Sequence, residues 1–257
     1  MGRGVDLHAL LELAAEEYAR ITPVSELERR IGAQASLPGV MEDFEQGLED
    51  IRRIVASDAA KLKRGTTYLV ERTLEMASTL FSAGAEPQAW RRWCGLTSLG
   101  YHLVDRRLSA AQFAALAGEW ELLARIERAP IHSGDAASVV FWKLIGGEIP
   151  EEPVYRDDSF DTAWRSLQLS IPRRVHRDIE SALKAIADYW IDDSGGAWEK
   201  FHPGEHPNFE QVVNAVAALA RHDGFTPTAL PSAQLRFLDA GLSPGEPEPL
   251  VPDVISV

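Results

Sequence analysis

The sequence predicts an all-α protein, built as an array of antiparallel helical hairpins with about ten helices and essentially no sheet. Apolar residues recur at steps of three and four along most of the chain, a spacing that places them on one face of a helix. Sustained alternation of apolar and polar residues is nearly absent, and there is no Asn-Gly hairpin turn. Short breaks containing Gly or Pro separate the periodic segments, which favours antiparallel neighbours.

Helix-start signals place the elements of the first part of the chain. Capping boxes occur at Ser25 with Glu28 and at Ser109 with Gln112, and prolines open two further segments. The expected helices are Val5 to Arg20, a short one from Ser25, Pro38 to about Lys63, Thr66 to Ala83, Pro87 to about Arg107, Ser109 to the stop at Pro130, and Ser133 to Ile145.

The most regular apolar spacing lies in the second part of the chain. One stripe, at steps of four, four, three and four, consists of Val175, Ile179, Leu183, Ile186 and Trp190. It predicts a helix over 172–191, with Pro172 in the first turn. An alanine-rich helix over 208–223 and a short one over 232–239 follow.

Prolines and glycines suggest where the chain divides. Gly146-Gly147 and Pro150 to Pro153 form a connector between an N-terminal helical half, 1–147, and a C-terminal helical half, 154–240. We expect the two halves to pack as one compact unit. Residues 241–257 hold too many prolines for a helix and are expected to be an extended tail.

The chain has 257 residues and a net charge of −13. Residues 61–130 hold ten basic and seven acidic residues, and the segments on either side are acidic. Such a surface repels nucleic acid and anionic membranes and attracts cationic partners, although acidity also serves solubility alone.

Cys94 is the single cysteine, which excludes an intramolecular disulfide and fits a reducing cytoplasm. It follows Trp90 and Trp93 in an apolar run, so we expect a buried thiol rather than a nucleophile. Acidic residues interrupt the N-terminal segment, which does not resemble a secretory signal. No apolar run approaches the roughly 18 residues of a membrane span. A soluble cytoplasmic protein is the expectation.

Charged side chains cluster in two ways along the predicted helices. Glu42, Glu45 and Glu49 share one face of the helix that starts at Pro38, a candidate surface for a basic partner. The densest basic cluster is Arg173-Arg174 with His176 and Arg177. It is expected to pair with Asp178, with Glu180 or with another helix, although anion binding is open.

One motif suggests an enzyme. Asp157, Asp158 and Asp161 read D-D-x-x-D, which in all-helical isoprenoid synthases holds magnesium for a pyrophosphate substrate. Here the motif precedes a predicted helix start, where the same acids would cap the helix and meet its dipole. The helix-capping interpretation is favoured, and a Mg-dependent enzyme stays as an alternative.

A second motif suggests a metal site. His202, Glu205 and His206 match H-x-x-E-H, but Pro203, Gly204 and Pro207 break the helix that this zinc signature needs. An ordered loop is expected instead, with no metal. There is no phosphate-binding glycine loop, no G-x-S-x-G elbow and no kinase motif set. No cofactor is expected.

The C-terminal half resembles a known family. Ala187, Tyr189 and Trp190 precede a loop with Trp198 and His202, and then come Phe209-Glu210 and the alanine-rich run to Ala220-Arg-His-Asp-Gly224-Phe225. This order is similar to the helical immunity proteins of bacterial polymorphic toxin systems. The segment from Leu80 to Trp90 is similar to the branch that inhibits secreted DNases. The likeness covers roughly 64–240, and His206-Pro-Asn208 stands where that branch has glycine-tyrosine-tryptophan.

The resemblance implies a non-enzymatic protein that binds one cognate toxin in the cytoplasm and neutralises it. Nuclease toxins are basic because they hold phosphates, so acidic faces would speed association. The candidate partner-binding residues are Glu42, Glu45, Glu49, Asp157, Asp158, Asp161, Asp192 and Asp193. A helical scaffold or regulatory binding protein is the further alternative, and no residue pattern indicates an oligomeric state.

Overall fold

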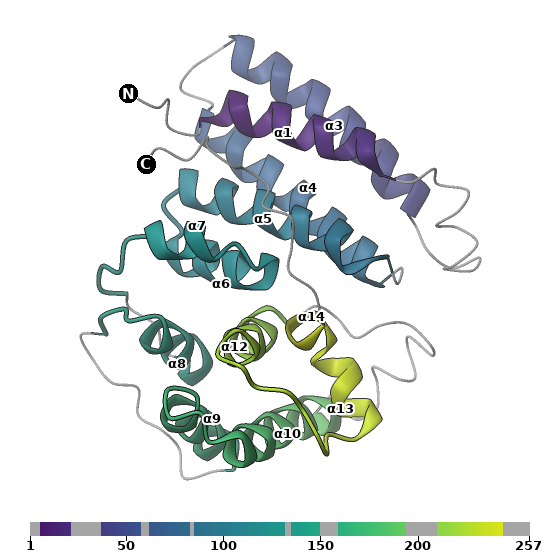
Figure 1. Ribbon diagram of the computed structural model, residues 1–257. Helices are drawn as coiled ribbons and strands as arrows, with labels where there is room; N and C mark the ends of the chain where they lie inside the picture. Colours follow the sequence, from purple (N-terminus) through teal and green to yellow (C-terminus); the bar gives the residue numbers. More distant parts are fainter. Residues whose placement is uncertain are drawn as a thin grey trace. The chain divides into compact units, whose positions relative to one another are not determined.

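The computed structural model describes residues 6–21, 37–57, 62–82, 85–131, 135–149, 159–193 and 210–243. Within these ranges every regular element is a helix and no strand occurs, which confirms the predicted all-α class. The described residues divide into two compact units, the first ending at Ile126 and the second beginning at Glu127 (Figure 1). None of the described helices is both long enough and apolar enough to cross a membrane.

The first unit is organised around α5. Its described helices are α1 (Leu7–Arg20), α3 (Leu37–Ser57), α4 (Leu62–Ser82), α5 (Pro87–Leu103), α6 (Arg107–Ala117) and α7 (Trp120–Arg125). Helix α5 packs against α1, α4 and α6, and all residues from Trp93 to Gly100 are buried. Burial on so much of its circumference makes α5 the core of the unit.

Helices α4 and α5 form an antiparallel hairpin. Phe81, near the end of α4, meets Trp90, near the start of α5, with ring centroids 5.4 Å apart. Further along, the buried hydroxyl of Thr97 on α5 donates a hydrogen bond of 3.0 Å to the hydroxyl of Thr73 on α4. Residue numbers therefore rise along one helix as they fall along the other, which confirms the predicted hairpin at this position.

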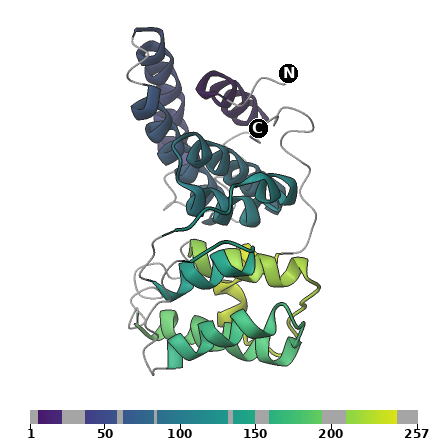
Figure 2. The ribbon, with the colours of Figure 1, turned by 90° about the vertical axis from the view of Figure 1, so that its left-hand side faces the viewer.

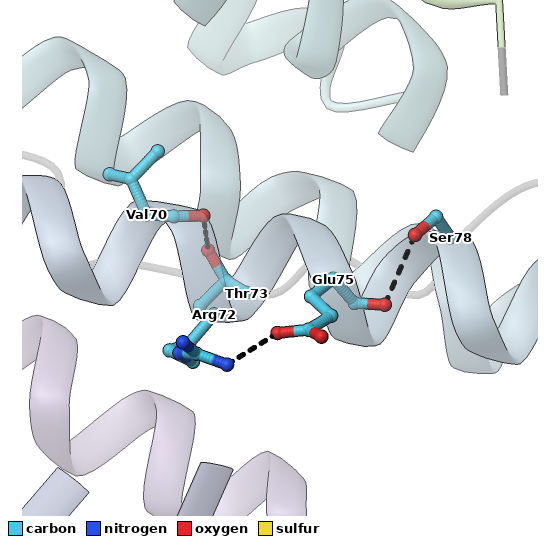
Figure 3. A network of polar contacts seen from close by, with 5 residues as sticks. All are labelled: Val70, Arg72, Thr73, Glu75 and Ser78. Atoms are coloured by element: carbon cyan, nitrogen blue, oxygen red, sulfur yellow. Dashed lines mark hydrogen bonds and ion pairs between the residues drawn. The ribbon is translucent and has the colours of Figure 1, made fainter. Parts of the chain in front are cut away.

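Several polar side chains of α4 are satisfied within the helix itself (Figure 3). The Thr73 hydroxyl donates to the Val70 carbonyl at 3.0 Å, and the Ser78 hydroxyl donates to the Glu75 carbonyl at 3.1 Å. Arg72 and Glu75 form an ion pair of 2.7 Å. These local bonds satisfy the hydroxyl groups of Thr73 and Ser78 within the helix, although the buried Nε of Arg72 has no hydrogen-bond partner among the described residues.

An ion pair joins α1 to α5. Glu17 is 5 % exposed, and the Nε of Arg92 donates to its carboxylate at 2.6 Å. The two residues are 75 positions apart in the chain, so their contact ties the first helix to the core. Removal of either partner would leave a poorly solvated charge, which is costly.

The second unit contains the helical hairpin formed by the α9 and α10 segments and a group of helices packed around the α12 segment. Its described helices are α8 (Ala136–Leu144), α9 (Ser159–Ser170), α10 (His176–Asp193), α12 (Gln211–His222), α13 (Ser232–Phe237) and α14 (Asp239–Leu242). Helices α9 and α10 pack side by side (Figure 2), and α12 lies between α8 and α14 (Figure 1).

A buried asparagine fixes α12 against the last two helices. The Asn214 amide donates to the Phe237 carbonyl at 3.2 Å, and its side-chain oxygen accepts from the Gly241 N–H at 2.9 Å. Gly241 approaches α12 so closely that an added Cβ would lie 2.3 Å from the backbone oxygen of Asn214. Only a residue without a side chain fits there.

Several predicted helix boundaries are wrong. The helix predicted from Thr66 starts earlier, because α4 begins at Leu62 and Gly65 lies within it. The predicted helix from Ser109 is interrupted at Gly118, whose φ of 77° ends α6 before α7 begins. Pro172 lies in the turn before α10 rather than in its first turn.

The division between units also differs from the expected one. It falls after Ile126, so α8 belongs with α9 and α12, and the Gly146-Gly147 connector lies within the second unit. The cause is packing, because α8 contacts α9 and α12. The expected tail begins too early, since Gly241 and Leu242 are part of α14. The helix expected from Ser25 lies outside the described residues.

We expect Gly241→Ala to lower the free energy of unfolding by about 1–3 kcal/mol, because the new Cβ would collide with the α12 backbone. Chemical denaturation would measure the change. The matched control is Gly47→Ala on α3, where the nearest atom is the movable ring of Tyr68 at 3.3 Å. Since alanine favours a helix by about 1 kcal/mol over glycine, the control should be neutral or stabilising. Equal effects at both positions would contradict the prediction.

Candidate functional site

Three glutamates project from one face of α3. Glu42, Glu45 and Glu49 are exposed, and with Gln46 they line a shallow surface hollow of about 280 Å³. None of the three makes an ion pair within the described part of the chain. The neighbouring Asp50, in contrast, pairs with Arg53 at 3.2 Å. The hollow therefore presents uncompensated negative charge.

The opposite face of α3 explains why these glutamates point outward. Phe44, Leu48 and Ile51 are buried, at steps of four and three that place them on one face of the helix. The Phe44 ring packs edge-on against Trp93 of α5 at 4.8 Å and stacks on Tyr18 of α1 at 5.4 Å. With these side chains held in the core, a rotation of α3 that buried the glutamates would expose three large apolar residues.

Glu45 affects the pKa of the neighbouring Tyr18 hydroxyl. Burial raises the pKa of the Tyr18 hydroxyl, and the nearby Glu45 carboxylate raises it further. Burial is the larger cause, and Glu45 adds to it because a neighbouring negative charge disfavours the charged form of a phenol.

A second acidic region lies at one end of the α9–α10 hairpin. Phe160, at the start of α9, stacks on Tyr189, near the end of α10, with ring centroids 4.2 Å apart. This contact brings the first turn of α9, which holds Asp161, beside the last turn of α10, which holds Asp192 and Asp193. The structure therefore places the first turn of α9 beside the last turn of α10.

Not all of the candidate residues can be placed. Asp157 and Asp158 lie outside the described residues, as do the side chains of Asp192 and Asp193. Asp161 is half-buried. The α3 glutamates belong to the first unit and the other candidates to the second.

The aromatic cluster at this end of the hairpin was not predicted as a site. Phe160 contacts Trp164 at 6.1 Å and Trp190 at 6.5 Å in addition to Tyr189, which is 43 % exposed. In the sequence, Trp190 belongs to the apolar stripe and Tyr189 precedes it, so spacing alone gives Tyr189 no role. The signal available in the sequence was a tyrosine beside the apolar stripe, near the end of an amphipathic helix.

The charges at the two ends of α10 oppose its dipole. A helix carries partial positive charge at its N-terminus and partial negative charge at its C-terminus. Arg173, Arg174 and Arg177 stand at the start of α10, whereas its last turn holds Asp192 and Asp193 and no basic residue. Asp178 in the first turn is the favourable exception. This distribution destabilises the helix, so helix stability does not account for it.

The expected pairing of the basic cluster is absent. Arg173, Arg174 and Arg177 are exposed, and within the described residues no ion pair joins them to Asp178 or Glu180. The Glu180 carboxylate instead accepts hydrogen bonds from two N–H groups and one hydroxyl in the segment that follows α12. The donors are the Thr228 N–H at 2.7 Å, the Thr228 hydroxyl at 2.9 Å and the Ala229 N–H at 2.6 Å.

The described residues bear on the metal and thiol sites that the sequence suggests. They contain no group of three or more His, Cys, Asp or Glu side chains placed to hold a metal ion. The H-x-x-E-H segment, 202–206, lies outside them. Cys94 is fully buried, which confirms the predicted core thiol, and burial raises its pKa. A thiol that stays protonated at neutral pH is a poor nucleophile.

Comparisons with known proteins place the chain in no family. No family model, no curated protein and no solved structure matches it.

We expect Glu180→Gln to lower the melting temperature at neutral pH and to weaken its dependence on acid. Burial by itself would raise the Glu180 pKa, but the hydrogen bonds from Ala229 and Thr228 together lower it below the ordinary 4.5. Its stabilising effect is therefore present above 4.5 and is lost as the pH falls through the lowered folded-state value. Thermal melts from pH 7 to pH 3 would measure it. Glu71→Gln, at an exposed position on α4, is the control and should leave the profile unchanged.

Neutralising the last turn of α10 should stabilise the protein. We expect the double substitution Asp192→Asn with Asp193→Asn to raise the free energy of unfolding by about 0.3–1 kcal/mol per charge, because carboxylates oppose the negative end of the helix dipole. Asp178→Asn, at the favourable end, should instead destabilise. Denaturant titrations at low ionic strength would compare the variants. A loss of stability in the double variant would show that these acids have a structural role.

Proposed function

We propose that this protein is an immunity protein that binds and neutralises a basic, nuclease-like bacterial toxin domain in the cytoplasm, without catalysis. The observation that carries the proposal is the acidic face of α3, where three exposed glutamates have no cationic partner among the described residues. Paired surface charges satisfy one another, but unpaired like charges on a rigid face are suited to an outside partner.

The spacing of these glutamates concentrates their effect. Glu42 and Glu49 are seven residues apart, which is about 10 Å along a helix axis. That distance is close to the Debye length of about 8 Å at physiological salt, so the three charges act together on an approaching molecule. A basic partner would be steered to this face and would associate faster.

An inhibitor with such a face can block a toxin by binding alone, without a catalytic step. A nuclease holds the phosphates of its substrate with Lys and Arg side chains, and carboxylates on a rigid helix can occupy the same positions. The inhibitor then competes with the nucleic acid for the toxin's basic surface. The last turn of α10 adds two further acidic residues in the sequence, Asp192 and Asp193, at the negative end of the helix dipole.

Two other functions make different demands. A magnesium-dependent isoprenoid-synthase-like enzyme would use Asp157, Asp158 and Asp161. Asp161 stands in the first turn of α9 rather than deep within a helix. Such an enzyme would show thermal stabilisation by magnesium with pyrophosphate, lost in Asp158→Ala. A scaffold or regulatory protein would bind a partner that is not a toxin.

The identity of the partner separates these functions. A tagged copy of the chain, purified from its native cells and washed at low and then high salt, would be analysed by mass spectrometry. One basic toxin domain released by salt supports the proposal. A partner with no toxic activity favours the scaffold, and stabilisation by magnesium with pyrophosphate favours the enzyme.

We expect the triple substitution of Glu42, Glu45 and Glu49 by Lys to slow association with the basic partner at least about ten-fold at low ionic strength and to flatten its salt dependence. Stopped-flow or surface-plasmon measurements at several salt concentrations would follow it. The control, Glu16→Lys with Glu71→Lys, changes exposed residues of α1 and α4 and should have a small effect. An unchanged rate in the triple variant would exclude α3 as the binding face.

A further inference from the structure

The turn that joins α9 to α10 carries a cluster of arginines. Residues 162–177 hold four arginines and no acidic residue, although the whole chain has a net charge of −13. Three of them, Arg173, Arg174 and Arg177, are exposed and form no ion pair within the described residues. We call residues 169–177 the arginine turn. It is a basic surface on an acidic protein.

No nearby carboxylate among the described residues pairs with these arginines. Asp178, in the first turn of α10, forms no ion pair there. Glu180 accepts its hydrogen bonds from the segment that follows α12. That segment reaches the arginine turn through Phe225, whose ring lies 5.9 Å from the ring of His176, and its exposed Asp223 forms no ion pair with the arginines. The positive charge of the turn is therefore available to another molecule.

The backbone of the arginine turn is ordered but strained. The Arg174 N–H donates to the Ile171 carbonyl at 3.0 Å, and the Val175 N–H donates to the Ser170 carbonyl at 3.1 Å. Arg174 has a φ of 55°, in the left-handed region that glycine adopts freely and residues with a Cβ seldom adopt. Acidic residues would also suit the positive end of the α10 dipole better than arginines. The stability of the fold thus does not account for the arginines.

Two exposed apolar side chains flank the arginines. Leu169, in the last turn of α9, is 50 % exposed, and Val175, just before α10, is 39 % exposed. The hydrogen bond from the Val175 N–H to the Ser170 carbonyl brings Val175 to the end of α9. Apolar groups beside unpaired arginines on an ordered turn are suited to contact with another protein, because arginine is enriched where proteins bind one another.

The same chain presents a surface of opposite charge. Glu42, Glu45 and Glu49 are exposed on α3, form no ion pair within the described residues and line a hollow of about 280 Å³. The hollow has room for a guanidinium group, since one water molecule occupies about 30 Å³ in the liquid. Three unpaired carboxylates on one copy of the chain match three unpaired arginines on another in number and in sign, and an arginine can donate two hydrogen bonds to one carboxylate.

We propose that the arginine turn binds the acidic face of α3 on a second copy of this chain. The three arginines donate to the three glutamates, and Leu169 and Val175 shield the ion pairs from water, which strengthens them. Whole copies repel one another, but salt screens this repulsion beyond about 8 Å, whereas ion pairs in direct contact persist. Nucleic acids and anionic membranes are extended polyanions that the acidic chain repels as a whole. This association requires no toxin and so goes beyond the proposed function.

Sedimentation velocity of the full chain measures the association. We expect a dissociation constant between about 10 µM and 1 mM at physiological salt, because the contact is small. The triple variant Arg173→Glu, Arg174→Glu and Arg177→Glu, called the arginine variant, should not associate. Its thermal melt should match or exceed that of the wild type, because acids suit the start of α10.

The control for the arginine variant is Lys63→Glu with Arg64→Glu, at two exposed positions on α4, and it should associate as the wild type does. Equal association in the arginine variant and the wild type would overturn the inference. So would a wild-type chain that stays monomeric up to about 1 mM.

An exchange of charge between the two surfaces tests their pairing. The variant Glu42→Lys, Glu45→Lys and Glu49→Lys has two positive surfaces, and the arginine variant has two negative ones, so neither should associate alone. In a mixture each surface of one variant meets a surface of opposite sign on the other, and a complex should form. Both variants keep a net negative charge, so overall attraction does not explain a complex. The absence of a complex in the mixture would overturn the inference.

Other occupants of the arginine turn give different results. The probes are duplex DNA and vesicles that contain phosphatidylserine. Binding of either that is lost in the arginine variant, together with a monomeric wild type, would assign the turn to a polyanion and overturn the inference. If copies pair as expected but no basic toxin domain binds, the self-association stands and the proposed function is wrong. If a toxin domain binds and no copies pair, the proposed function stands and the self-association is wrong.

Discussion

The burial of α5 is the constraint on which the first unit depends. All residues from Trp93 to Gly100 are buried, so the helices around α5 must each turn an apolar face inward. On α3 this face is Phe44, Leu48 and Ile51, with Phe44 packed against Trp93. Once these side chains are in the core, the glutamates on the other side of α3 have no freedom to turn away from solvent. The acidic face is thus a consequence of the packing and is held rigidly by it.

The second unit shows a different relation between stability and surface charge. Its helices are joined by specific polar contacts, such as the Asn214 amide between α12 and α14 and the Glu180 carboxylate on the turn at Thr228. Helix α10, however, carries arginines at its positive end and aspartates at its negative end. Reversing these charges would suit the helix dipole better, so the present arrangement lowers the stability of α10.

The face of α3 and the end of the α9–α10 hairpin differ in the side chains that they expose. The α3 face provides charge without exposed aromatic residues among its lining side chains. The end of the α9–α10 hairpin combines charge with the stacked rings of Phe160 and Tyr189. In protein association generally, charge acts over distance and chiefly affects the rate of association, whereas direct contacts chiefly affect dissociation.

The sequence by itself determined the helical class, the buried middle of the α10 stripe at Ile179, Leu183 and Ile186, the core position of Cys94 and the exposure of Glu42, Glu45 and Glu49; Val175, at the start of the predicted stripe, is exposed. All of these follow from the local 3.6-residue period and from the cost of burying charge. Tertiary structure alone decided that α8 joins the second unit, that Glu180 binds a distant turn rather than the adjacent arginines, and that Phe160 stacks on Tyr189. The physical reason is that each of these contacts joins residues far apart in the chain. Their formation depends on how whole helices pack, which local spacing does not encode.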